Sequence, residues 1–131
     1  MWEQQVSLSD LDWHGHVNNA RMIAWIQDSW NDLLSPGEGV APSFAAVSHE
    51  ARYSVPLPYC ASVGIHTVVT EIRRSRVTGT AKITDGGVVH AQITTSWVAF
   101  DVEARCARAV TEAERENLGR HYVPAEEAEA T

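Results

Sequence analysis

The densest group of chemically reactive side chains in this sequence lies at residues 10–19, where the chain reads Asp-Leu-Asp-Trp-His-Gly-His-Val-Asn-Asn. Two carboxylates, Asp10 and Asp12, stand close to two imidazoles, His14 and His16. A carboxylate can act as a nucleophile or a general base, and an imidazole can transfer a proton near neutral pH. The cluster therefore predicts either a site for acyl transfer or hydrolysis, or a loop whose acids and asparagines only cap the helix that follows.

A helix is expected directly after this cluster, over about residues 17–34, because the run from Met22 to Ile26 is apolar and polar residues follow it. Asn18 or Asn19 can cap its start. The first amides of a helix lack an intrahelical acceptor, and the helix dipole makes this end favour negative charge. A substrate carbonyl placed there would be polarised and its oxyanion stabilised.

The rest of the chain is predicted to form an antiparallel sheet that covers this helix, which is an α+β arrangement. One short strand precedes the helix and four follow it in succession, with an Asp-Gly-Gly hairpin signal at residues 85–87. A capping box at Thr111 and Glu114 opens a second, short helix. The strands are expected at residues 2–9, 43–55, 62–73, 75–84 and 88–100.

Length and composition restrict the class of protein. The chain has 131 residues, 44% of them hydrophobic, which fits a single domain that we assign to residues 1–123, with a disordered acidic tail at 124–131. A net charge of −7 argues against nucleic-acid binding. We see no membrane span and no secretory signal. Cys60 and Cys106 lack the spacing of a zinc site or disulfide framework, so we expect a cytoplasmic protein with reduced thiols.

The segment from Ser9 to Ile26 resembles the start of the hotdog-fold thioesterases. Its Ser-Asp-Leu-Asp, His-Val-Asn-Asn and Ile-Ala-Trp-Ile runs are most similar to the acyl-ACP (acyl carrier protein) branch. The Asp-x-Asp-x-x-Gly spacing also resembles the single-domain 4-hydroxybenzoyl-CoA type. The resemblance implies a sheet of about five strands wrapped around one long central helix, and hydrolysis of an acyl thioester without a metal or organic cofactor.

The resemblance also implies roles for individual residues. Asp12 corresponds to the catalytic carboxylate, acting as nucleophile or general base, and His16 to a catalytic or substrate-orienting residue. The backbone N–H of Asn19, seven residues beyond Asp12, corresponds to the oxyanion donor. The remaining loop residues that we expect to contact substrate are His14, Gly15, Val17 and Asn18.

Two positions depart from the acyl-ACP branch. His14 replaces the asparagine of that branch's catalytic loop. The stretch at residues 53–57, Tyr-Ser-Val-Pro-Leu, carries neither member of its Glu-Cys pair. The mechanism of the 4-hydroxybenzoyl-CoA type, which is centred on the Asp, does not need that pair.

A local basic group is formed by Arg73, Arg74 and Arg76, and its role has two interpretations. They are a solvated strand end, or they bind the phosphates of coenzyme A. The choice between acyl-CoA and an acyl carrier protein stays open, although the negative charge of the chain argues mildly against an acidic carrier. An open sheet edge favours self-association. The resemblance places the site between two subunits, so we expect a homodimer or homotetramer.

Two other functions remain open at this stage. One is a hydratase or dehydratase on the same fold, which would also use an acid and a histidine. The other is a non-catalytic module that binds acyl thioesters, since a fold does not guarantee an activity.

Overall fold

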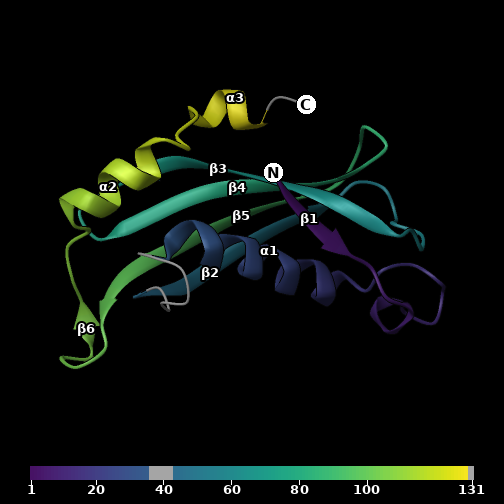
Figure 1. Ribbon diagram of the computed structural model, residues 1–131, viewed down its shortest axis with the longest axis horizontal. Helices are drawn as coiled ribbons and strands as arrows, with labels where there is room; N and C mark the ends of the chain where they lie inside the picture. Colours follow the sequence, from purple (N-terminus) through teal and green to yellow (C-terminus); the bar gives the residue numbers. More distant parts are fainter. Residues whose placement is uncertain (36–42, 130–131) are drawn as a thin grey trace.

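The computed structural model describes residues 1–35 and 43–129 and contains a six-stranded antiparallel sheet (Figure 1). The strands are β1 (Trp2–Gln5), β2 (Phe44–Tyr53), β3 (Ser62–Ile72), β4 (Arg76–Asp85), β5 (Val88–Asp101) and β6 (Cys106–Ala107). The helices are the 3-10 turn η1 (Leu8–Asp10), α1 (Asn19–Leu34), α2 (Glu112–Gly119) and α3 (Ala125–Glu129).

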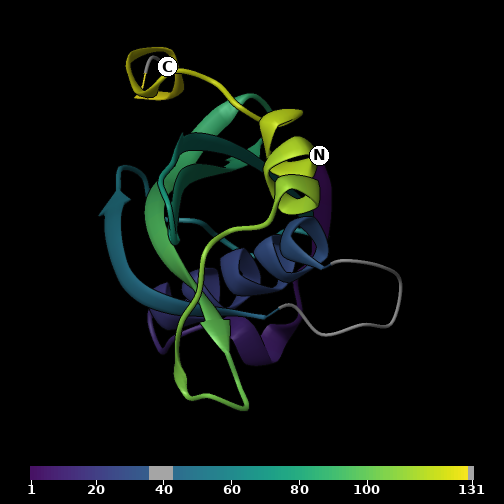
Figure 2. The ribbon, with the colours of Figure 1, turned by 90° about the vertical axis from the view of Figure 1, so that its left-hand side faces the viewer.

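The sheet has the strand order β1-β3-β4-β5-β2, and β6 pairs with the end of β5. It curls around α1, as the view along the sheet shows (Figure 2). This arrangement confirms the predicted α+β hotdog fold. The short strand β6 is additional to the five strands expected from the sequence. Within the described residues, no helix has both the length and the apolar character needed to cross a membrane.

Alternation along the strands places one face of the sheet against α1. The inner side chains of β5 from Ala91 to Ala99 are buried at every second position, as the sequence predicted. Trp30 of α1 is fully buried and packs over Gly79 of β4, where a Cβ would collide with the indole ring and the Val68 carbonyl. This glycine lets the helix approach the sheet closely.

The N-terminal segment differs from the prediction. The strand expected over residues 2–9 ends at Gln5, and η1 follows it. Ser7 caps this turn, and the Asp10 carboxylate accepts the Ser7 backbone N–H at 2.8 Å. A side chain that bonds the backbone locally competes with strand pairing, which explains the change. Leu8 is consequently 71% exposed.

The helix α1 also differs from the prediction in two details. It begins at Asn19 and not at Val17, because the Val17 N–H donates to Leu57 O at 2.7 Å in a connecting segment. Its middle is not enclosed on all sides, since Ala24 is exposed although Met22 and Ile26 are buried. The helix is thus amphipathic, with one face against the sheet.

The C-terminal segment is more ordered than the sequence suggested. Residues 125–129, which we expected within a disordered tail, form α3, while residues 130–131 lie outside the described part. The carbonyl of Pro124 accepts the N–H groups of Glu127 and Ala128, which starts this turn. Ala128 is 5% exposed, and such burial offsets the entropy cost of ordering the tail.

Candidate active site

The loop that carries the reactive cluster is held in place by Asp10. Its carboxylate is 8% exposed, accepts bonds from the backbone and hydroxyl of Ser7, and lies 3.7 Å from Arg21 Nε. Its carbonyl accepts the Asn18 N–H at 2.8 Å. Asp10 therefore ties the start of the loop to the start of α1 and is not available to a substrate.

Asp12 organises the turn that follows. Its backbone N–H donates to His16 O at 2.7 Å, and Gly15 N donates to Asp12 O at 3.1 Å. Its Oδ1 atom accepts the N–H groups of His14 (2.9 Å) and His16 (3.1 Å). Gly15 has φ +82°, a conformation that glycine adopts readily. The second oxygen, Oδ2, has no bonding partner in the described part of the chain.

The start of α1 lies beside this loop and carries the backbone N–H of Asn19. Asn18 is the N-cap, and its Oδ1 accepts the Ala20 N–H at 2.9 Å, as the sequence predicted for one of the two asparagines. Asn19 is the first helical residue, and residues 1–35 and 43–129 provide no acceptor for its N–H. A developing oxyanion on a substrate would accept a hydrogen bond from that N–H.

A pocket of about 240 Å³ brings these groups together. Asp12, His16 and Asn19, the three predicted catalytic residues, line it together with Tyr53 from the end of β2. The remaining walls are apolar and come from Val17, Met22, Val55, Pro56 and Leu57. The pocket combines one carboxylate, one imidazole and one helix N-terminus with an apolar wall, which suits an acyl group and its polar head.

Tyr53 is a polar wall residue that our sequence analysis gave no role. Its hydroxyl donates to Asn19 O at 3.4 Å, so it links β2 to the first turn of α1. Burial raises the pKa of the Tyr53 phenol, and the group stays protonated at neutral pH. The adjoining wall from residue 55 to 57 was also missed, because Pro56 signalled only the end of a strand.

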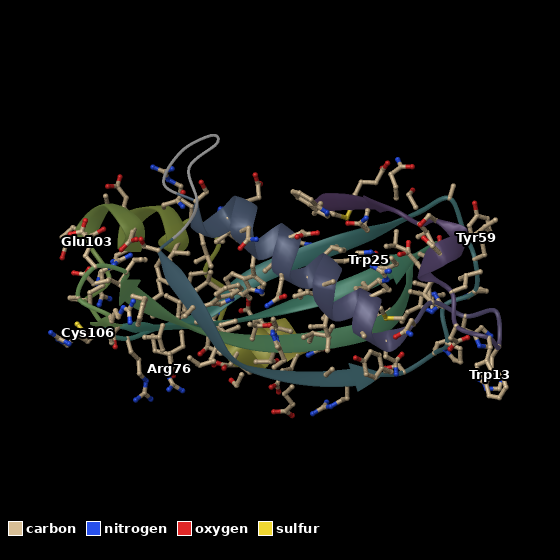
Figure 3. The ribbon with its side chains drawn as sticks, turned by 90° about the horizontal axis from the view of Figure 1, so that it is seen from below. Trp13, Trp25, Tyr59, Arg76, Glu103 and Cys106 are labelled. Atoms are coloured by element: carbon tan, nitrogen blue, oxygen red, sulfur yellow. The ribbon has the colours of Figure 1, made fainter. Side chains whose placement is uncertain are left out.

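The other loop residues predicted to contact substrate take different positions. Val17 lines the pocket, whereas His14, Gly15 and Asn18 are outside its lining. His14 is exposed, and its ring lies 5.1 Å from that of Trp13, which is 93% exposed at the tip of the loop (Figure 3). Gly15 allows the turn of the loop, and Asn18 caps the start of α1.

The basic group lies at the opposite end of the molecule. In the sheet register, Tyr53 pairs with Ala91, and Arg76 pairs with Val98, about 23 Å farther along β5 at 3.3 Å per residue. Figure 3 shows Arg76 and Trp13 near opposite ends. The structure therefore does not bring the basic group to Asp12 within one chain.

The three arginines also differ in their local contacts. Arg73 forms an ion pair with Glu71 at 2.9 Å. The carbonyls of Arg73 and Arg74 accept bonds from the Arg115 guanidinium, which fixes the turn between β3 and β4. The side chains of Arg74 and Arg76 have no carboxylate partner in the described ranges.

Two larger hollows lie elsewhere, of about 330 Å³ beside β3 and about 370 Å³ beneath α2. Neither lies at the N-terminus of α1. No group of three or more His, Cys, Asp or Glu side chains among the described residues is arranged to hold a metal ion.

The chain belongs to the thioesterase-like superfamily, whose family model matches residues 6–126. This membership places the protein among the thioester hydrolases. Comparison with curated proteins gives no match.

Solved structures of similar proteins agree in fold. A predicted thioesterase from Bacillus stearothermophilus is 20% identical, with 94% of this chain and 96% of that one covered and a TM-score of 0.84. A Thermus thermophilus thioesterase, solved with coenzyme A and zinc, is 23% identical, with 91% and 90% covered and a TM-score of 0.78. Escherichia coli YbaW, described as a probable thioesterase, is 22% identical over 92% and 96%, with a TM-score of 0.76.

Proposed function

We propose that this protein hydrolyses acyl-CoA thioesters at the pocket beside the start of α1. One observation supports the assignment above all. The Asp12 carboxylate and the Asn19 residue, whose N–H lacks an acceptor in the described residues, line the same pocket. A base or nucleophile beside an oxyanion donor is the arrangement that hydrolysis of a thioester needs.

Asp12 acts in this proposal through its Oδ2 atom, because Oδ1 is already held by two backbone amides. As a general base, Oδ2 takes a proton from a water molecule whose oxygen bonds to the thioester carbon. As a nucleophile, Oδ2 bonds to that carbon itself, and water later cleaves the acyl-enzyme anhydride. In both routes the C–S bond breaks, the acyl group leaves as a carboxylic acid and the thiolate gains a proton.

His16 and Tyr53 assist the reaction in different ways. The His16 imidazole lines the pocket without a hydrogen-bond partner in the described residues, and we assign it the transfer of a proton to the departing thiolate. The protonated Tyr53 hydroxyl positions the first turn of α1 by donating to Asn19 O. His14, Gly15, Val17 and Asn18 maintain the loop or the wall that faces the substrate.

Coenzyme A is favoured over an acyl carrier protein. The net charge of −7 repels an acidic carrier, and one solved relative in fold contains coenzyme A. Since the arginines at residues 73–76 are far from Asp12 in their own chain, we assign them to coenzyme A bound at a partner's site. Replacing Arg74 and Arg76 by alanine then raises KM for acyl-CoA and leaves KM for acyl-pantetheine, which lacks the nucleotide, unchanged.

The proposal includes a homodimer joined through β2. This strand has ten residues and forms one edge of the sheet, whereas β1 at the other edge has four. A long edge with open backbone groups favours pairing with another strand. A second copy paired there would extend the sheet across both subunits, and two dimers would give a tetramer. Both cysteines are free, which supports a reducing, cytoplasmic location.

Incubation with a panel of acyl-CoAs and a thiol reagent tests the activity. Release of free thiol supports hydrolysis. A change in enoyl absorbance without free thiol would instead identify a hydratase or dehydratase, and binding without turnover would identify a non-catalytic module. Either of the last two results would overturn the proposed hydrolase.

A further inference from the structure

A buried imidazole that the proposed mechanism does not use lies next to the pocket wall. His90 of β5 is 6% exposed. Ile83 of β4 pairs with Ala91, and the residue after it pairs with Val89. His90 lies between these two partners, opposes no residue of β4 and forms a β-bulge. A bulge breaks the alternation of a strand, and His90 and Ala91 are buried one after the other. The bulge therefore gives the ring a direction that a regular strand would not.

His90 holds the chain directly after β2 by three hydrogen bonds. Its backbone carbonyl accepts the N–H groups of Ser54 at 2.9 Å and of Val55 at 3.4 Å. Its Nδ1 atom lies 3.0 Å from the Val55 carbonyl oxygen. A carbonyl oxygen only accepts hydrogen bonds, so Nδ1 carries the proton and donates. His90 therefore bonds to both polar groups of the Val55 backbone.

The imidazole replaces a strand partner that the chain does not provide at this point. β2 ends at Tyr53, and Pro56 has no backbone N–H with which to continue a ladder. Among the residues that the structure describes, only the His90 ring donates to the Val55 carbonyl. Without this bond, the carbonyl would lose its partner, and the direction of the chain at Val55 would no longer be fixed.

The segment that His90 holds is the apolar wall of the pocket. Residues 55–57 line the pocket together with Asp12. At the end of this wall, Leu57 O accepts the Val17 N–H at 2.7 Å, which joins the wall to the loop that carries Asp12. At its beginning, the wall is held by His90. The wall is thus fixed at both ends, and its position relative to Asp12 depends on the imidazole.

We propose that His90 is a positioning residue that fixes the wall at residues 55–57 and thereby determines which acyl groups fit the pocket. This inference rests on the proposed function. His90 is outside the pocket lining, so it acts through Val55 and does not contact the substrate. A wall held at both ends gives the pocket one shape, and a methylene group that this shape does not accommodate lowers kcat/KM by about 10-fold or more. A wall that is free at one end moves aside and accepts longer acyl groups.

Two substitutions separate the hydrogen bond from the bulk of the ring. Asparagine and leucine side chains both branch at the γ position and have similar shapes. His90→Asn places an amide N–H where Nδ1 of the imidazole lies, and this group can donate to the Val55 carbonyl. His90→Leu has no donor and leaves that carbonyl unpaired. A difference between the two variants therefore reports the hydrogen bond and not the loss of the ring.

The experiment measures kcat/KM by thiol release for straight-chain acyl-CoAs of increasing length. Selectivity is the ratio of kcat/KM for the best substrate to kcat/KM for the substrate two carbons longer. We expect a ratio of at least about 10 in the wild type and in His90→Asn. In His90→Leu the ratio falls about fivefold. The change is in KM, and kcat for the best substrate stays within about threefold, because the wall contacts the acyl group equally in the ground and transition states.

Gln92→Leu is the matched control, because Gln92 lies two residues away on the same strand and is outside the pocket lining. The ratio in this variant stays at the wild-type value. Thermal unfolding and light scattering establish that each variant is folded and keeps the wild-type mass. If His90→Leu does not fold, His90→Gln takes its place, since the glutamine amide lies one bond farther from the backbone and misses the Val55 carbonyl.

Three results overturn the inference. The first is a wild-type ratio near one. The second is an unchanged ratio in a folded His90→Leu protein, even at a lower Tm, because His90 would then be only structural. The third is an equal loss of selectivity in His90→Asn and His90→Leu, because the bond to Val55 would then not be the cause.

Binding separates this inference from the proposed function. Calorimetry measures the affinity for the same acyl-CoAs in a protein that shows no turnover. If the acyl-CoAs bind with a chain-length preference that His90→Leu abolishes, but none is hydrolysed, the hydrolase proposal fails and the role of His90 stands. If they are hydrolysed without a preference that depends on His90, the role of His90 fails and the hydrolase proposal stands. Absence of both binding and turnover overturns both.

Discussion

Asp12 has a structural and a chemical role that two substitutions separate. Its Oδ1 atom holds the amides of His14 and His16, while Oδ2 is free of protein partners in the described residues. Asp12→Asn retains an oxygen for both amides and removes the ionised group. Asp12→Ala removes both functions. We therefore expect the two variants to be equally inactive but unequally stable.

The magnitudes follow from these contacts. Loss of a general base lowers kcat/KM by about 10²–10⁴-fold in both variants. Water replaces the lost bond to the exposed His14 amide, so the half-buried His16 amide determines the cost of Asp12→Ala. One such unpaired group costs about 1 kcal/mol, which lowers Tm by about 4 °C in a domain of this size. Asp12→Asn is expected to stay within about 1 °C of the wild type.

Thiol release from the best acyl-CoA and thermal unfolding are measured for each variant. Asp10→Asn is the control, because Asp10 is buried and braces the loop away from the pocket. It lowers stability by about 1–2 kcal/mol, yet kcat/KM stays within about threefold. Near-normal activity in a folded Asp12→Asn protein would refute the assignment of the carboxylate. If Asp10→Asn and Asp12→Asn lost equal activity, Asp12 would only maintain the loop and would have no chemical role.

Four further outcomes are expected. Trp25→Ala removes a core aromatic that is 5% exposed and lowers the free energy of unfolding by about 3–5 kcal/mol, measured with denaturant; a variant of wild-type stability would contradict this. Gly79→Ala forces a methyl group against the Trp30 ring and costs about 1–3 kcal/mol, visible as a lower Tm. Burial raises the pKa of the Glu114 carboxyl, but hydrogen bonds from Arg108 and Thr111 outweigh it and lower the pKa below 4.5. This stabilisation is present above pH 4.5 and is lost as the pH falls through the lowered value, so Glu114→Gln weakens the acid dependence of unfolding. Light scattering gives a mass of at least twice 14.4 kDa, and a fully active monomer would exclude the shared site.

The sequence was sufficient for the elements whose signals are local. Alternating apolar residues predicted the inner face of β5, and the capping box at Thr111 and Glu114 is present at the start of α2. The motif from Asp12 to Asn19 predicted three residues that the structure brings into one pocket. The predictions for β5 and α2 succeeded because hydrophobic periodicity and helix caps depend on nearby residues. The catalytic roles of Asp12, His16 and Asn19 stay predictions.

The features that the sequence did not reveal depend on contacts between distant residues. The position of Arg76 relative to Asp12 follows from the register of β2, β4 and β5, which a single sequence does not reveal. The pocket wall at residues 55–57 is joined to the segment before α1 by the Val17 N–H, which donates to Leu57 O, and by the bridge between His16 and Pro58. The tail was judged by its charge alone, and the burial of Ala128 was not visible in that pattern.

Trp13 gives this protein an optical reporter on its own active-site loop. Its indole is 93% exposed, one residue from Asp12, whereas Trp25, Trp30 and Trp97 are at most 5% exposed in the core. Trp2, the fifth tryptophan, is half-buried. A collisional quencher in the solvent therefore suppresses the emission of Trp13 most strongly and that of Trp2 in part, and it leaves the core emission largely intact. Fluorescence of the unlabelled protein can then follow two processes separately. The quenched fraction of the emission reports ligand binding, and the shielded fraction reports unfolding.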